Sequence, residues 1–413
     1  MSAYLDQLES RNPAQREATL MSELPAQIAH AKAKAGGYAR ILADVDPRVV
    51  TSRKALAQLP VTRKSDLHAL QKDAVPFGGL NATAVGGMAR IFMSPGPIFD
   101  PEGHGPDWWR MARPLYAAGF RKGDVVQNCF SYHFTPAASM LEGGALALGC
   151  AVIPAGTGQT EMQVQAMSLL KPAGYVGTPS FLKIILEKAA EMNMDVSATR
   201  TALVAAEALP PSLRQWLLAH GMTRVLQTYA SADLGNIAYE SEAMEGLIVD
   251  EQIILEILRP GTGDPVPDGE VGEVVVTKLD RHYPLVRFAT GDLSAVLPGI
   301  SPCGRTNMRI RGWMGRADQT TKVKGMFVHP QQVAEVQKRH PEIVRARLVV
   351  DNPDNADRMT LHCEVVGTVP AGLAERIAES LRDVTKLRGE VSLRKPGELP
   401  NDGKVIEDAK KYD

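Results

Sequence analysis

Short apolar runs alternate with longer amphipathic segments through the middle of the chain. The pattern predicts helices at 137–148, 161–170, 180–192 and 211–220, and strands at 123–130, 150–154, 174–177, 201–205 and 224–228. Strands that alternate with helices of this length indicate βαβ units in a parallel sheet. Such sheets bind ligands at the loops that leave the carboxyl ends of their strands. We therefore expect the functional site at these loops.

The N-terminal part of the chain has a mainly helical pattern. Ala, Leu, Glu and Gln are frequent in residues 6–33, where Pro25 is expected to break the helix. Thr62 is expected to cap a further helix, with Asp66 in its first turn. Residues 108–119 carry apolar side chains at i, i+3 and i+4 spacing, which predicts an amphipathic helix.

Beyond about residue 245 the pattern changes to short β runs separated by Pro and Gly. These runs, at 253–258, 270–277, 285–288 and 293–297, indicate a small and mostly antiparallel subdomain. After a polar, glycine-containing stretch at 315–325, the order is helix 330–338, strands 344–350 and 359–366, helix 373–387 and strand 391–394. We therefore expect an α/β fold. Its parts are a large domain at 1–314 with a β subdomain at about 245–312, a hinge at 315–320, and an α+β domain at 321–413.

Composition excludes several classes of function. Lys and Arg number 46 and Asp and Glu 47, a net charge of −1, and proteins that bind nucleic acid usually carry a basic excess. No apolar run approaches the ~18 residues of a membrane helix, and the N-terminus has no secretory pattern, so we expect no membrane partner. The cysteines are far apart, which favours a cytoplasmic protein with reduced thiols; they are Cys129, Cys150, Cys303 and Cys363.

Several motifs, taken in order, resemble the phenylacetate–CoA ligase branch of the adenylate-forming enzymes. The resemblance begins at "LPVTRKSDL" near residue 60 and includes "VIPAGTGQTEMQ" at 152–163, "GTPSFL" at 177–182 and "AAEAL" at 205–209. The most specific match is "DGEVGEVVVTKLDRHYPLVRFATGDL" at 268–293. "CGRT", "GRADQTTKVKGMFVHPQQVAEV" and "LPNDGKVIED" follow in the order of the family.

The resemblance implies a large α/β domain, a mobile C-terminal domain and a two-step reaction. A carboxylate, with an aromatic acid of the phenylacetate type favoured, attacks the α-phosphate of ATP to give an acyl-adenylate and pyrophosphate. CoA then displaces AMP. Since the reactants are like-charged, Mg²⁺ and a lysine are needed to neutralise phosphate oxygens. The expected partners are therefore the acid, ATP and CoA, and a homodimer is left open.

Residues at the end of the large domain and beyond take their expected roles from the resemblance. Asp292 would accept the ribose hydroxyls of ATP, and the pattern places it in a turn after a strand. Arg316 would hold the ribose or phosphate, and Asp318 would be the hinge. Lys404 would be the catalytic ammonium that reaches the carboxylate and α-phosphate. A loop of the second, thioester-forming arrangement would contain Lys324 and Gly325.

The adenine and metal positions lie on loops after the strands. Ala206 and Glu207, in "AAEAL", are expected to contact the nucleotide. In "YASAD", Tyr229 matches the family tyrosine beside the adenine, and Asp233 stands for the glutamate that helps bind Mg²⁺. Ala232 replaces a hydroxyl residue that contacts phosphate, which removes a hydrogen bond worth about 1 to 3 kcal/mol if it is charge-assisted.

The segment 93–103, "MSPGPIFDPEG", departs most from the family. The family has there a Ser/Thr/Gly-rich loop with a lysine that wraps the β- and γ-phosphates. This segment keeps Ser94 and Gly96 as candidate phosphate contacts, but it has three prolines, two acids and no lysine. Since proline lacks an N–H donor, the segment is poor as a triphosphate cradle, and a rigid surface turn is the favoured interpretation.

Two further sites follow from the same comparison of residues. Some members of the branch carry a structural zinc, but Ser241, Ile248 and Ser301 stand where ligands would be needed, and Cys303 alone cannot make a tetrahedral site. We therefore predict no structural zinc.

For the acid pocket, Tyr132 and Phe134 after the first strong strand could form an aromatic slot that binds the acid. Ordinary packing of the two side chains in the core is an equal alternative.

Three functional hypotheses remain at this point. The first is a Mg²⁺-dependent acid–CoA ligase that forms AMP. The second is a protein of the same fold that binds AMP or an acyl group and has lost its phosphate chemistry. The third keeps adenylation but transfers the acyl group to an acceptor other than CoA. The matching residues Asp292, Arg316, Asp318 and Lys404 favour an enzyme, whereas the divergent segment 93–103 and Ala232 favour the second.

Overall fold

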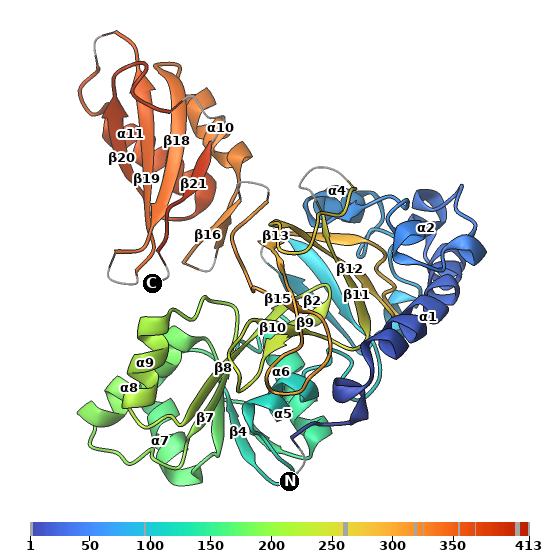
Figure 1. Ribbon diagram of the computed structural model, residues 1–413. Helices are drawn as coiled ribbons and strands as arrows, with labels where there is room; N and C mark the ends of the chain where they lie inside the picture. Colours follow the sequence, from blue (N-terminus) through green and yellow to red (C-terminus); the bar gives the residue numbers. More distant parts are fainter. Residues whose placement is uncertain are drawn as a thin grey trace. The chain divides into compact units, whose positions relative to one another are not determined.

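The computed structural model divides into two compact units, Met1–Met314 and Gly315–Asp413. It describes residues 3–94, 96–258, 263–317, 320–324, 326–353, 356–367, 369–400 and 405–411. Figure 1 shows the course of the chain through both units. Each unit is described by itself below.

A nine-stranded sheet forms much of the N-terminal unit. Its strand order is β14-β15-β10-β9-β8-β7-β6-β4-β5. The parallel strands are β4 (Val125–Asn128), β5 (Ala151–Ile153), β6 (Gly174–Gly177), β7 (Thr201–Val204) and β8 (Arg224–Ser231). The antiparallel extension contains β9 (Gly235–Glu240), β10 (Leu247–Val249), β14 (Val296–Leu297) and β15 (Arg309–Ile310). The predicted α/β class with parallel βαβ units is confirmed.

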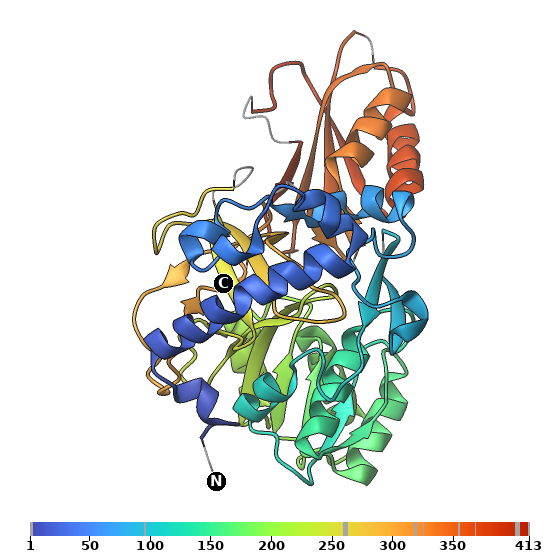
Figure 2. The same cartoon turned by 90° about the vertical axis from the view of Figure 1, so that its right-hand side faces the viewer.

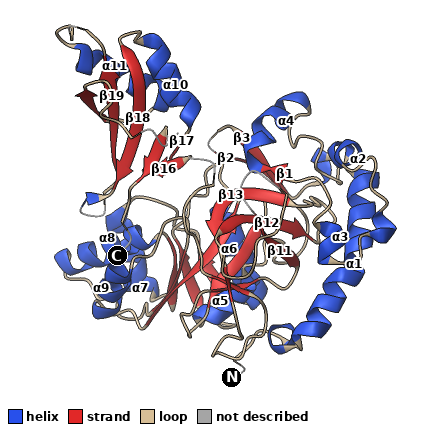
Figure 3. Cartoon of the chain, turned by 45° about the horizontal axis from the view of Figure 1, so that its top comes forward, coloured by secondary structure: helices blue, strands red, loops and turns tan. Residues whose placement is uncertain are grey.

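Helices cover both faces of the parallel strands (Figure 3). One face carries α5 (Ala112–Ala118) and α6 (Ala137–Leu148), and the other α7 (Thr160–Leu170), α8 (Pro179–Glu191) and α9 (Pro211–Ala219). Neighbouring strand residues serve opposite faces: Val176 packs with the cluster of α5 and α6, and Tyr175 with that of α7 to α9. Both faces are therefore buried, which explains the continuous apolar runs of these strands.

A second sheet contains four strands in the order β1-β13-β12-β11. Antiparallel pairing joins β11 (Ile253–Leu258), β12 (Gly272–Lys278) and β13 (Phe288–Ser294), and β1 (Thr62–Arg63) lies parallel to β13. Helices α1 (Pro13–Lys34) and α2 (Gly36–Ile41) lie along this sheet and share its apolar core (Figure 2). The same unit contains α3 (Arg53–Leu56), α4 (Leu67–Asp73) and the hairpin of β2 (Arg90–Ser94) and β3 (Ile98–Glu102).

The C-terminal unit is a small α+β fold with its own apolar core. Its sheet has the order β20-β19-β18-β21, and α10 (Pro330–Arg339) and α11 (Leu373–Thr385) pack on it. The strands are β18 (Ile343–Asp351), β19 (Arg358–Val365), β20 (Glu390–Arg394) and β21 (Ile406–Asp408), with a separate hairpin of β16 (Thr321–Val323) and β17 (Met326–Val328). In the described parts of the chain, no helix combines the length and apolar character needed to cross a membrane.

Three local predictions in the N-terminal unit are wrong. Pro25 lies inside α1, which continues through it because Leu24 and Ile28 on the same helix are fully buried in the core. Thr62 is not a helix cap but a residue of β1, paired with Phe288. The helix expected from residue 108 begins only at Ala112, after a turn.

Candidate active site

The predicted nucleotide residues of the N-terminal unit gather at the carboxyl end of β8. Tyr229 lies on β8, and Asp233 lies in the turn between β8 and β9. Asp292 comes from β13 of the other sheet. The site is therefore built where the two sheets of the unit meet. Tyr229 and Asp233 lie at the carboxyl end of a parallel strand, where the sequence analysis expected the functional site.

A direct hydrogen bond joins two of these residues. The Tyr229 hydroxyl donates to Asp292 Oδ2 at 2.8 Å, and the Trp313 indole donates to Asp292 Oδ1 at 3.1 Å. Asp292 lies inside β13 rather than in a turn after a strand, so that prediction is wrong. Gly291 has a positive φ of 76°, which lets the strand deviate and present the carboxylate. A carboxylate has about four acceptor positions, so it can accept hydrogen bonds from several donors at once.

Asp233 is fully buried and forms an ion pair that the sequence analysis missed. Lys64 donates to Asp233 Oδ2 at 2.5 Å, and Lys64 is 26% exposed at its side chain. Burial opposes the charge on Lys64, but the carboxylates of Asp233, Asp100 and Asp292 outweigh burial and raise the pKa of Lys64 above its ordinary value. The site thus contains an ammonium group that belongs to "LPVTRKSDL" and not to the divergent segment 93–103.

The segment 93–103 forms an exposed turn at Gly96 and Pro97, as expected, but most of it belongs to the two strands of the β2–β3 hairpin. Its residues from Asp100 to Gly103 are buried. The Ser94 hydroxyl donates to Asp100 Oδ2 at 2.8 Å, and Gly96 lies in the hairpin turn. Burial and then the negative charge of Asp233 raise the pKa of Asp100 to about 8. The hairpin therefore brings a carboxyl group, not a lysine, to Asp233.

Ala206 and Glu207 follow β7 and lie on a loop at the same end of the sheet. Ala206 has a positive φ of 67°, a conformation that a residue with a side chain adopts rarely. Glu207 accepts a hydrogen bond from the Ser180 hydroxyl at 2.6 Å. The hydrogen bond ties this loop to the start of α8, within "GTPSFL".

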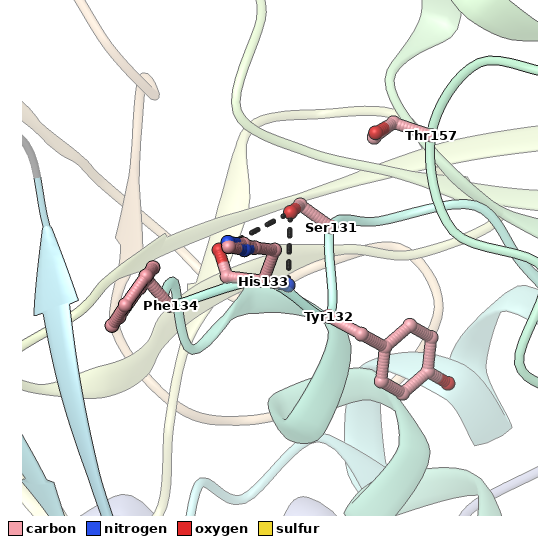
Figure 4. A pocket seen from close by; sticks show the side chains of 5 residues that line it. All are labelled: Ser131, Tyr132, His133, Phe134 and Thr157. Carbon is pink, nitrogen blue, oxygen red and sulfur yellow. Dashed lines mark hydrogen bonds between the residues drawn. The ribbon is translucent and has the colours of Figure 1, made fainter.

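An open pocket of about 510 Å³ lies at the loop after β4. Figure 4 shows the side chains that line it, which are Ser131, Tyr132, His133, Phe134 and Thr157. Phe134 is 59% exposed, so it does not belong to the packed core. The Tyr132 hydroxyl donates to Glu142 at 2.7 Å and accepts from Asn128 at 3.0 Å, which fixes its ring at the edge of the pocket.

The remaining predicted residues belong to the C-terminal unit or are not described. Arg316 lies in that unit with its guanidinium 5.6 Å from the centre of the Phe327 ring. The backbone N–H of Lys324 donates to Asp357 Oδ2 at 2.7 Å. Three residues lie outside the described part of the chain, and they are Asp318, Gly325 and Lys404.

The four positions compared with a zinc site are close together. The Ser301 hydroxyl lies 3.1 Å from the Cys303 sulfur, and Ser241 also hydrogen-bonds that sulfur. Cys303 packs against the small buried cluster to which Ile248 belongs. Burial raises the pKa of Cys303, but the hydrogen bonds of Ser241, Ser301 and Arg305 outweigh it and lower the pKa below its ordinary value. Within the described ranges, no group of three or more His, Cys, Asp and Glu could hold a metal ion.

Comparison with known proteins agrees with this architecture. A family model described as AMP-binding enzyme matches residues 108–279. A phenylacetate–coenzyme A ligase from Thermus thermophilus is 29% identical over 96% of both chains, and one from Pseudomonas putida is 31% identical over 70% of this chain and 67% of its own length. A crystal structure of 2-hydroxyisobutyryl-CoA ligase superimposes with a TM-score of 0.83 at 22% identity, covering 100% of this chain and 93% of that one, and so shares the fold.

The fold and these relatives place the chain among the adenylate-forming, AMP-binding enzymes. Within that class it belongs to the phenylacetate–CoA ligase family. The resemblance inferred from the motifs is confirmed, and the class of enzyme is an AMP-forming acid–CoA ligase.

The sequence analysis missed two residues of this site, Lys64 and Asp100. The signal for Lys64 was its position in "LPVTRKSDL", since a lysine in a motif shared with a nucleotide-binding family is a candidate phosphate contact. Asp100 was counted only as an acid unfavourable to phosphate. Its partners, Ser94 and Asp233, become visible only when the hairpin is folded.

Proposed function

We propose that this chain activates a carboxylic acid with ATP and transfers the acyl group to CoA, and that an aromatic acid of the phenylacetate type is the preferred substrate. The observation that carries the proposal is the hydrogen bond of Tyr229 to Asp292, which joins the two sheets at the positions that the family uses for adenosine. The full-length similarity to phenylacetate–coenzyme A ligases supports the acid and the acceptor.

The nucleotide is held mainly by groups of the N-terminal unit. Asp292 accepts the ribose hydroxyls while Tyr229 and Trp313 keep its carboxylate oriented. The adenine lies beside Tyr229 and the Ala206–Glu207 loop. Lys64 forms an ion pair with Asp233. When ATP binds, the Lys64 ammonium donates to a phosphate oxygen in place of the Asp233 carboxylate. The acid enters through the pocket at Phe134.

Magnesium fits the residues present at Asp233. One oxygen of this buried carboxylate, Oδ1, has no hydrogen-bond partner in the described part of the chain. Mg²⁺ prefers oxygen ligands and is usually held by one or two carboxylates together with substrate phosphates. When bound, it would supply positive charge to the phosphate oxygens.

The C-terminal unit supplies residues to both steps, with different residues acting in adenylation and in thioester formation. We assign Lys404 to the adenylation step, Arg316 to the nucleotide, Asp318 to the hinge, and Lys324 and Gly325 to the thioester step. A lysine on a separately folded unit can be brought to the α-phosphate for the first step and withdrawn for the second.

Lys404→Ala tests this division of labour. The variant should lose formation of acyl-adenylate from ATP and phenylacetate but should still convert a preformed phenylacetyl-adenylate to the CoA thioester. Both half-reactions can be followed by mass spectrometry in single-turnover mixtures. Lys411→Ala, which removes an exposed lysine from the same tail, is the matched control and should run both steps. Equal loss of both half-reactions in Lys404→Ala would show that the assignment is wrong.

The alternative of a binding protein is favoured by one observation, the carboxyl group of Asp100 in place of a phosphate-binding loop. Such a protein would bind AMP and release no pyrophosphate with any acid. The mass-spectrometric assay with wild-type protein separates the two functions, since only the ligase produces AMP and an acyl-CoA.

A further inference from the structure

The β2–β3 hairpin brings a second carboxyl group to the site of Asp233. Asp100 lies opposite Phe92 in the hairpin register and is 1% exposed. The Ser94 hydroxyl at the end of β2 holds its Oδ2 at 2.8 Å. The Asp100 carboxyl also hydrogen-bonds the Asp233 carboxyl, so the two groups are in direct contact.

Apart from the hydrogen bond between them, each of these two carboxyl groups has a buried oxygen that no other group serves. Asp100 Oδ1 and Asp233 Oδ1 receive no hydrogen bond from any other described residue, while Lys64 engages the other oxygen of Asp233. A buried carboxylate oxygen without a partner costs free energy. Because the two carboxyl groups are in contact, one cation bound by both would compensate both oxygens.

We propose that Asp100 and Asp233 together bind the divalent cation that accompanies ATP, so that Asp100 is a metal ligand contributed by the segment that replaces the phosphate-binding loop. The inference rests on the proposed function, because the cation acts there as the counter-ion of a triphosphate. Two carboxylates with phosphate oxygens and water complete the coordination that Mg²⁺ prefers.

The arrangement makes nucleotide binding depend on the metal in a specific way. Without a divalent cation, the negative charge of Asp233 disfavours the β- and γ-phosphates. With the cation, the same carboxyl groups attract the complex. AMP lacks these two phosphates, so its affinity should depend little on the metal or on Asp100.

The test is calorimetric titration of the full chain with α,β-methylene-ATP, which cannot be cleaved at the attacked bond, and with AMP, in EDTA and in MgCl₂. In wild-type protein Mg²⁺ should strengthen analogue binding at least about tenfold, the equivalent of one charge-assisted contact. Asp100→Asn keeps an acceptor for Ser94, and it should lose most of this gain while binding the metal-free analogue about as tightly as wild type does. Ser94→Ala, which only frees Asp100 to move, should lose part of the gain.

Glu102→Gln is the matched control, since Glu102 lies on the same strand but pairs with Arg90 at 2.9 Å. It should behave as wild type. A full metal gain in both Asp100→Asn and Ser94→Ala would overturn the role of Asp100 and leave the proposed function intact. Wild-type protein that bound neither AMP nor the analogue would contradict the proposed function and this inference together.

Discussion

Replacement of the buried Lys278 by methionine should stabilise the N-terminal unit, most strongly at low pH. Lys278 lies at the end of β12, is fully buried, and has its ammonium 3.4 Å from the centre of the Trp108 ring. Burial lowers its pKa to about 7, against the pull of Asp280 at 3.9 Å. Below about pH 7 the folded protein therefore carries a charge in a place that disfavours it.

The magnitude follows from the two pKa values. The gap between the ordinary 10.5 and about 7 corresponds to a cost of about 5 kcal/mol when the ammonium is charged in the folded protein. Repacking of the new side chain against Trp108 should offset up to about 1.5 kcal/mol of this. Methionine fills a similar volume without the charge, so Lys278→Met should raise the free energy of unfolding by about 3 kcal/mol at about pH 6.

The pH dependence has a definite sign. Below the folded pKa of about 7 the lysine is charged in both states and the whole cost is present. As the pH rises toward the unfolded pKa, the folded protein gives up the proton while the unfolded chain keeps it, so the cost declines. The advantage of Lys278→Met should therefore shrink steadily between about pH 7 and about pH 10.

Guanidinium unfolding followed by tryptophan fluorescence measures this difference, since all four tryptophans lie in Met1–Met314. Lys183→Met is the matched control. Lys183 also lies over a tryptophan ring, Trp216 at 5.3 Å, but its side chain is 38% exposed. Its replacement should therefore change the free energy of unfolding by at most about 0.5 kcal/mol, both at about pH 6 and at about pH 10. A Lys278→Met variant less stable than wild type at about pH 6, or an advantage independent of pH, would refute the reasoning.

Three other variants test separate parts of the account. Tyr229→Phe removes the 2.8 Å hydrogen bond to Asp292 and should weaken AMP binding about tenfold in calorimetry. Unchanged affinity would show that Tyr229 does not orient the Asp292 carboxylate for the nucleotide. Arg287→Met leaves Glu256 buried without its partner and should lower the free energy of unfolding by about 3 to 5 kcal/mol, whereas a loss under about 1 kcal/mol would contradict the cost of an unpaired charge. Asp318→Pro should leave AMP binding and adenylate formation intact but reduce thioester formation by orders of magnitude in single-turnover assays. Wild-type rates in both steps would show that residue 318 is no hinge.

Local patterns predicted most of the parallel sheet, because its strands are buried on both faces and its helices have one apolar face. The strand predicted at 174–177 agrees with β6 (Gly174–Gly177) at both ends. The same reasoning failed where a distant partner decides the structure. Thr62 and Asp66 have the spacing of a helix start, but pairing with β13 draws Thr62 into a sheet.

The candidate site was only partly predictable for the same reason. Tyr229 and Asp292 could be named from motifs, yet their contact joins residues 63 positions apart on two sheets. The prolines of segment 93–103 suggested a turn, but Pro101 lies opposite Ile91 in a two-stranded hairpin. Only that pairing directs Asp100 toward Asp233, and no local pattern contains it.

The measurement that tests the central claim most directly is isotope exchange between pyrophosphate and ATP, catalysed by the wild-type chain with Mg²⁺ and each of a panel of aromatic and aliphatic acids. Exchange reports reversible formation of an acyl-adenylate without any acceptor. The account predicts exchange that requires an acid, proceeds without CoA, is strongest with aromatic acids of the phenylacetate type, and gives way to AMP and acyl-CoA when CoA is added. Protein that binds AMP but exchanges no pyrophosphate with any acid would contradict it.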